Sequence, residues 1–191
     1  MKNALNGIAW VAENAAIKSA NKELTRQFEH DLEDKIKEIE QNGGVDLSKI
    51  TNNPKFYAAE DEEFTQDGYD EIDRLTKQIA IDELGDYEVA GIDDLNDTNQ
   101  TVQAEAFDAY ATELGLNTTI NYSTGGSRYV EVNVGDESFK FRFANHYNTV
   151  CDTTMQSDIN VSPGGVDFTE AIDFLKEKID SATSFNFVSL K

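Results

Sequence analysis

The periodicity of the apolar residues changes from helical to strand-like close to Gly115, and this change constrains the fold more than any other feature. Before Gly115, apolar side chains recur at spacings of three and four, which is the period of an amphipathic helix. After it they alternate with polar side chains, which is the period of a β-strand with one face on a core. The sequence therefore predicts an α+β fold, helical in its front half and stranded in its back half.

Residues 1–44 are predicted to form an N-terminal helix or a helical hairpin. One apolar stripe comprises Leu24, Phe28, Leu32, Ile36 and Ile39, and an earlier one comprises Leu5, Ile8 and Val11. The two stripes belong either to one long helix or to a hairpin that breaks near Asn21, and Gly43-Gly44 ends the second stripe. Two interpretations of residues 5–39 remain open, packing on the rest of the chain or pairing with a second copy as a homodimer.

Residues 45–115 are predicted to be an acidic helical segment. A loop-like stretch over 45–66 precedes a helix whose apolar face holds Ile72, Leu75, Ile79 and Leu84. A second helix begins at Thr98 or Asn99 as its N-cap and ends at Gly115. Its apolar face is predicted to hold Val102, Ala106, Phe107, Tyr110 and Leu114.

Residues 116–191 are predicted to form a three- to four-stranded antiparallel β-meander covered by a C-terminal helix. The strands are "TTINYS", "SRYVEVNV" and "SFKFRFAN", with turns at Gly125-Gly126 and Gly135-Asp136 and a fourth strand at "SDINVS". The closing helix turns Phe168, Ile172, Leu175 and Ile179 inward. We expect this region to form one compact unit with residues 45–115.

The charge of the chain is concentrated in its middle. The 191 residues have a net charge of −21, and residues 60–113 hold 18 acids against two bases, Arg74 and Lys77. Such a chain is repelled by free nucleic acid and by anionic membrane surfaces. A one-signed segment of this kind indicates an interaction surface, and the partners it favours are basic proteins or cations.

Metal, cofactor and catalytic motifs are not found. With Gly68 as the central glycine of a calcium-binding loop, the twelfth position is Arg74, where a bidentate acid is required. The two histidines and the single Cys151 cannot build a zinc or disulfide framework. No signal peptide or membrane span is recognised, so we expect a cytoplasmic protein without cofactor or metal.

One cluster in the predicted sheet combines basic and aromatic side chains and is a candidate binding site. In a hairpin around Gly135-Asp136, Lys140 and Arg142 lie opposite the face of the three phenylalanines, with His146 at the strand end. Tyr129 or Glu131 is then across the ladder. Tyr129, Arg142 and His146 form a candidate anion- or nucleotide-binding site. The other interpretation is a solvent face with a charge pair between Glu131 and Arg142.

The same stretch, residues 127–146, resembles a short β-hairpin module with the pattern S-x-Y … R-(hydrophobic)-S-(D/N)-H. This module occurs in phage and mobile-element proteins, and Ala144 stands where the pattern has serine. The resemblance implies a phage or plasmid origin and assigns no catalytic residue.

In composition and layout the chain also resembles small acidic phage and plasmid proteins that block CRISPR effectors or restriction enzymes by imitating DNA. The resemblance implies a non-enzymatic inhibitor, in the bacterial host cytoplasm, of a basic nucleic-acid-binding protein. The candidate contacts are Asp67, Asp70, Glu71, Asp73, Asp82, Glu83, Asp86, Glu88, Asp93 and Asp94. The alternatives are a small anion- or nucleotide-processing protein acting through Tyr129, Arg142 and His146, and a dimeric structural or accessory phage protein.

Overall fold

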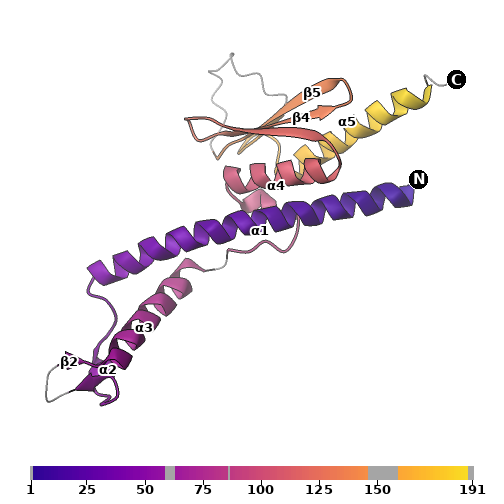
Figure 1. Ribbon diagram of the computed structural model, residues 1–191. Coiled ribbons are helices and arrows are strands. Elements are labelled where there is room, and N and C mark those ends of the chain that lie inside the picture. The colour runs from indigo at the N-terminus through magenta and orange to yellow at the C-terminus, as the bar shows by residue number, and fades with distance from the viewer. Residues whose placement is uncertain (1, 59–62, 86, 146–158, 189–191) are drawn as a thin grey trace. The chain divides into compact units, whose positions relative to one another are not determined.

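The computed structural model describes residues 2–58, 63–85, 87–145 and 159–188 (Figure 1). Its helices and strands follow the chain in the order α1 (Lys2–Gln41), α2 (Ser48–Thr51), β1 (Tyr57–Ala58), β2 (Glu63–Phe64), α3 (Gln66–Leu84), the 3-10 helix η1 (Asp93–Asp97), α4 (Gln100–Glu113), β3 (Asn117–Tyr122), β4 (Arg128–Val134), β5 (Glu137–Phe143), β6 (Ile159–Val161) and α5 (Phe168–Val188). The predicted α+β fold is confirmed.

The chain forms two compact units. Unit 1 comprises residues 1–24 and 88–191, and unit 2 comprises residues 25–87. Helix α1 is continuous from Lys2 to Gln41 and contributes to both units, so the alternative of a hairpin breaking near Asn21 is wrong. After the helix the chain turns at Gly43 and Gly44, both with positive φ, and the Gly44 amide donates to the Ile39 carbonyl oxygen.

The sheet of unit 1 has the strand order β3-β4-β5-β6. The three longer strands are antiparallel, as predicted, and the tight turn at Gly135-Asp136 sets Val134 opposite Glu137. Strand β6 is parallel to β5, so the prediction of a purely antiparallel meander is wrong. Residues 144–158 connect these two strands. A connection of this length can carry the chain back to the end of the sheet where β5 begins, so that the next strand runs parallel to it, whereas a two-residue turn cannot.

Helix α4 lies between the sheet and the first part of α1 (Figure 1). On the sheet side, Phe107 of α4 packs against Phe141, Phe143 and Phe168, with ring centroids 4.4, 5.4 and 6.2 Å away. These four rings are fully buried and form the centre of the core.

Helix α1 joins this core through small residues. Ala12, Ala16 and Ala20 are fully buried at intervals of four, which places them on one side of the helix. Alanine at these positions allows a close approach of backbones, and the Ser19 hydroxyl donates to the Glu105 carbonyl oxygen of α4 at 3.2 Å. The Asn21 amide group both donates to and accepts from the backbone of Val89.

Unit 2 contains residues 25–41 of α1 together with α2, the β1–β2 pair and α3. The side chain of Thr65 caps α3 by accepting a hydrogen bond from the Gly68 amide, and Gly85, with φ of 78°, ends the helix. The buried residues of α3 are Gly68, Thr76 and Ala80, while the predicted apolar stripe of Ile72, Leu75, Ile79 and Leu84 is half-buried. A Cβ atom at Gly68 would clash with the Phe56 carbonyl oxygen, so glycine is required for this contact.

Helix α5 begins with a reciprocal cap. The Glu170 amide donates to the Asp167 carboxylate at 2.8 Å, and the Asp167 amide donates to the Glu170 carboxylate at 3.0 Å. The hydrogen bond from the Glu170 amide, with a further one from the Thr169 hydroxyl, lowers the pKa of Asp167 below its usual value. The ionised carboxylate is therefore favoured by folding.

Asp167→Ala is expected to lower the free energy of unfolding at neutral pH by about 1 kcal/mol, because the cap is lost. A carboxyl group whose pKa is lowered by folding contributes stability above its unfolded pKa and loses it as the pH falls through the folded pKa. Urea titrations should therefore show the deficit at pH 7 and a smaller one below about pH 4. Asp167→Asn keeps a capping oxygen, so near-normal stability is expected for it at pH 7, and an equal loss in both variants would contradict the capping role.

Candidate functional site

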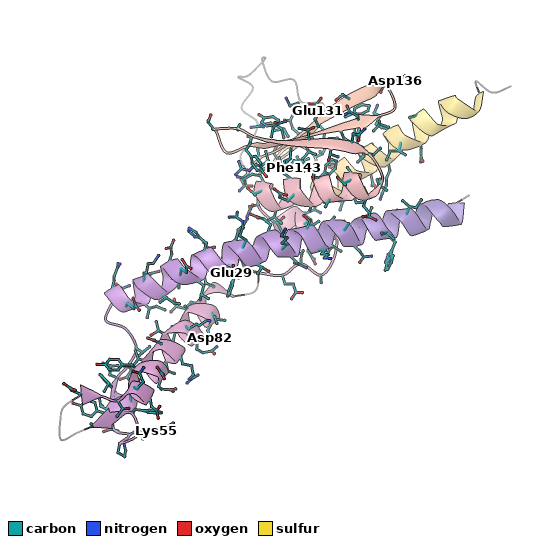
Figure 2. The ribbon with its side chains drawn as sticks, in the orientation of Figure 1. Glu29, Lys55, Asp82, Glu131, Asp136 and Phe143 are labelled. Atoms are coloured by element: carbon teal, nitrogen blue, oxygen red, sulfur yellow. The ribbon has the colours of Figure 1, made fainter. Side chains whose placement is uncertain are left out.

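Helix α3 presents most of its carboxylates to solvent. Asp70, Asp73 and Asp82 are exposed, as the periodicity predicts, and Figure 2 labels Asp82 on this helix. Asp67 is exposed as well. Glu83 is also exposed, and Glu71 is half-buried. Six of the ten predicted contact residues therefore lie on one helix whose backbone is fixed at both ends.

Three of these six carboxylates are compensated within unit 2. Glu71 takes a bidentate pair from the Arg74 guanidinium, with nitrogen–oxygen distances of 2.8 and 2.9 Å. The hydrogen bonds from Arg74 lower the pKa of Glu71. The Lys35 ammonium lies 2.8 Å from Glu83, and this hydrogen bond raises the pKa of Lys35. The third pair joins Lys55, labelled in Figure 2, to Asp67 at 3.5 Å.

The other three carboxylates of α3 take part in no ion pair among the described residues. Asp70 and Asp82 each accept one hydrogen bond from a neutral amide, of Gln66 and Gln78 respectively, at 2.9 Å. Asp73 has no ion-pair partner among the residues that the structure describes. Asp70, Asp73 and Asp82 are therefore the α3 carboxylates most available to a basic partner, and we call them the open triad.

The remaining predicted contacts lie outside unit 2 or outside the described residues. Glu88, Asp93 and Asp94 belong to unit 1 and are exposed. Asp94 has a structural role, because its carboxylate accepts the backbone amides of Ala90 and Gly91 at 2.9 and 2.8 Å. Asp86 lies outside the described residues. The structure thus brings the α3 carboxylates together and places the other three on a separate unit.

The charge density limits what α3 can imitate alone. At about 1.5 Å per residue, its 19 residues span roughly 28 Å. Six acids and two bases give a net charge of −4, or about one charge per 7 Å, against about one per 1.7 Å in duplex DNA. Unit 2 as a whole is denser, because residues 25–87 hold 18 acids and 7 bases, a net charge of −11.

Part of that charge was not predicted to contribute to the surface. Glu29, Glu33, Asp34, Glu38 and Glu40 of α1 are exposed and belong to unit 2. They fell in a near-neutral window of the sequence, because counting along the chain averages them with the lysines that surround them. The sequence does not show that α1 is divided between two units, and it is this division that places these acids in the same unit as α3.

An aromatic cluster accompanies the acids at the start of α3. Tyr57 of β1 is paired with Phe64 of β2, and their rings lie edge to face at 5.3 Å. Phe64 in turn meets Tyr69 of α3 at 5.7 Å. Tyr69 is 54% exposed, so an aromatic ring lies open next to Asp70. We call Tyr57, Phe64 and Tyr69 the aromatic tip.

The alternative site on the sheet is only partly described. Tyr129 is directly opposite Arg142 in the β4–β5 register, and Glu131 is opposite Lys140. Glu131 and Arg142 are therefore diagonal neighbours, and the charge pair between them stays a prediction. Tyr129 was expected on an open polar face, but it is only 7% exposed, and the Lys140 ammonium lies 5.1 Å from its ring centre. His146 lies outside the described residues, so its place near Arg142 stays a prediction.

A cavity of about 570 Å³ lies in unit 1, where β5 and β6 end and α4 and α5 begin. The backbone amides at its two helix starts are already used. Asn96 and Asn145 accept hydrogen bonds from the amides of Phe168 and Gln100 respectively. The charged lining residues among those described are Asp97 and Asp167, so the cavity offers no compensation for an anion.

The described residues contain no group of three or more histidine, cysteine, aspartate or glutamate side chains placed to hold a metal ion. Nor does any described helix combine the length and the apolar content needed to cross a bilayer.

The fold and this surface define an α+β protein with an acidic helical unit that carries an exposed aromatic residue. Comparisons with family models, curated proteins and solved structures give no significant match.

Proposed function

We propose that this protein is a non-enzymatic inhibitor that occupies a basic nucleic-acid-binding surface of a bacterial defence complex, a CRISPR effector or a restriction enzyme. The observation that carries the proposal is the net charge of −11 on the 63 residues of unit 2, with the open triad exposed on a capped helix. Its mechanism is stoichiometric exclusion of the nucleic acid in the bacterial cytoplasm.

The electrostatic cost of unit 2 supports a binding role. Like charges at helical spacing, such as Asp70 and Asp73, destabilise a helix by a few tenths of a kcal/mol per pair. Solubility alone requires a moderate charge of mixed sign, not a concentration of one sign on a third of the chain. A basic groove offsets this repulsion and is reached faster because the field steers the encounter.

The aromatic tip supports a protein partner over simple cations. Interfaces gain most of their affinity from a few buried aromatic or arginine side chains, while surrounding charges set the rate and the specificity of association. Tyr69 is suited to this role, because its ring is exposed and already held against Phe64. In this proposal the open triad attracts the partner and Tyr69 anchors it.

Displacement of nucleic acid tests the proposal. Labelled duplex DNA bound to each of a panel of purified CRISPR effectors and restriction enzymes would be titrated with the protein, and fluorescence anisotropy would report the released duplex. We expect release by one member at close to equimolar protein, with an apparent affinity that falls as salt rises. Binding to a panel member that leaves the duplex in place, or release that is insensitive to salt, would contradict charge mimicry.

Tyr69→Ala is expected to weaken binding to the displaced effector by about ten- to thirtyfold, because a central aromatic anchor is removed. The effect should appear in the dissociation rate and persist at high salt, unlike that of a charge. Tyr69→Phe keeps the ring and its contact with Phe64, so it serves as the matched control and should bind within about threefold of the parent. Equal losses in both variants would exclude the ring as the anchor.

A further inference from the structure

Asn42 lies at the exposed end of helix α1, directly before a glycine. It follows the last helical residue, Gln41, and both Asn42 and Gly43 are exposed. The Asn42 backbone amide donates to the Glu38 carbonyl oxygen at 3.0 Å. Its side chain makes no hydrogen bond within the part of the chain that the structure describes. The Asn42 carboxamide can therefore rotate toward the following residue.

The other two asparagines of unit 2 are held in place. The Asn52 side-chain amide donates to the Ser48 carbonyl oxygen at 2.7 Å, and the Asn53 side-chain oxygen accepts the Lys55 amide at 3.0 Å. Neither is followed by glycine, and Asn53 precedes Pro54, which has no backbone N–H. The combination of an unbonded carboxamide with a following glycine is thus particular to Asn42 within unit 2.

The backbone nitrogen of Gly43 is weakly bound and accessible. Gly43 has a φ of 105°, a conformation that glycine adopts without strain. Its N–H donates to the Glu40 carbonyl oxygen at 3.4 Å, whereas such bonds are usually about 2.9 to 3.0 Å long. A Cβ atom built on Gly43 would meet no atom within 4 Å, so the space around this residue is open.

We infer that Asn42 is a site of spontaneous deamidation, and that the reaction loosens the end of α1. The Gly43 nitrogen attacks the Asn42 Cγ atom and a C–N bond forms. The side-chain nitrogen leaves as ammonia, taking up the proton that the Gly43 nitrogen gives up. Water then opens the resulting succinimide ring. Opening at Cγ gives aspartate, and opening at the backbone carbonyl carbon gives isoaspartate, whose main chain runs through the former side chain.

The same dipeptide occurs once more in the chain, and there it lies inside helix α1. Asn6 and Gly7 both fall within Lys2–Gln41. The Gly7 N–H belongs to the hydrogen-bond ladder of the helix, so this bond has to open before the nitrogen can react. The two sites have the same chemistry in different structural settings, and the chain therefore contains its own control.

The products at position 42 disturb the end of α1. The Gly44 amide closes the helix by donating to the Ile39 carbonyl oxygen at 2.9 Å. Isoaspartate lengthens the main chain by one carbon before Gly43, so the bond from Gly44 loses its register. Both products also place a carboxylate at the C-terminal end of the helix, four residues after Glu38, where the helix dipole and the like charge disfavour it.

Peptide mapping of the full chain tests the inference. The protein would be incubated at body temperature, sampled over time and digested with trypsin. The tryptic peptide of residues 38–49 has Asn42 as its single asparagine, and that of residues 3–18 contains Asn6. We expect a gain of one mass unit at Asn42, with conversion of Asn6 at least about threefold slower because its glycine is bonded in the helix. In urea the two sites should convert at similar rates.

Asn42→Gln is the matched control. It keeps a neutral carboxamide but requires a six-membered ring, so it should stay unmodified over the same period. An intact Asn42 in the parent protein overturns the inference, and so does equal conversion of Asn6 and Asn42 in the folded chain.

Asn42→Asp separates the added charge from the lengthened main chain. Hydrogen exchange at the Gly44 amide should be about three- to tenfold faster in the isoaspartate form, isolated by chromatography, than in Asn42→Asp, since one hydrogen bond is lost. Equal exchange in the two proteins would refute the loosening of α1. Neither Asn42 nor Gly43 belongs to the open triad or the aromatic tip, so these results are independent of DNA displacement.

Discussion

Phe107→Ala is expected to lower the free energy of unfolding of unit 1 by about 3 to 5 kcal/mol, the usual range for removing a buried phenylalanine. The ring is fully buried and touches three other rings, from β5 and the start of α5. Its loss leaves a cavity where the helix, the sheet and α5 meet, and rigid neighbours cannot fill it. Urea denaturation followed by far-UV circular dichroism would measure the change.

The control for this prediction is Phe28→Ala in unit 2. Phe28 is half-buried and has one recorded ring contact, with Tyr87, so a loss of about 1 to 2 kcal/mol is expected. A Phe107→Ala protein within about 1 kcal/mol of the parent would mean that the four-ring centre does not hold the sheet to its helices.

The sheet could be predicted from the sequence in most respects because its signals are local. Val130, Val132 and Val134 alternate with polar residues, and the turn at Gly135-Asp136 fixes the register of the next strand. The parallel pairing of β6 could not be predicted, because it depends on where a fifteen-residue connection returns the chain. The burial of Tyr129 was missed for a related reason, since alternation indicates which side a residue faces but not what covers that side.

The candidate surface could be predicted in outline but not in its internal compensation. Helical periodicity placed the open triad on the solvent side of α3, which the structure confirms. The pairing of Glu83 with Lys35 joins residues far apart in the chain, so counting charges along the sequence could not detect it. Net charge over a window therefore overestimates the charge available on α3 and omits the acids of α1.

Reversing Asp70, Asp73 and Asp82 together to lysine is expected to weaken binding to the displaced effector by roughly a hundredfold, at about 1 kcal/mol for each reversed contact. These three side chains are exposed and take part in no ion pair among the described residues, so the fold of unit 2 should be retained. The loss should appear mainly in the association rate and shrink at about 0.5 M salt, where the Debye length falls to a few ångströms. Stopped-flow binding at two salt concentrations, with circular dichroism as the test of folding, would measure it.

A matched triple separates a local surface from net charge. Asp136, Glu137 and Glu177 are exposed residues of unit 1, and their reversal to lysine changes the net charge from −21 to −15, the same change that the open triad produces. Because long-range attraction is screened beyond about 10 Å, this control should weaken binding by less than about fivefold. Equal losses in the two triples would mean that the partner senses only the total charge. A full-strength complex with the reversed open triad would refute α3 as the surface that replaces nucleic acid.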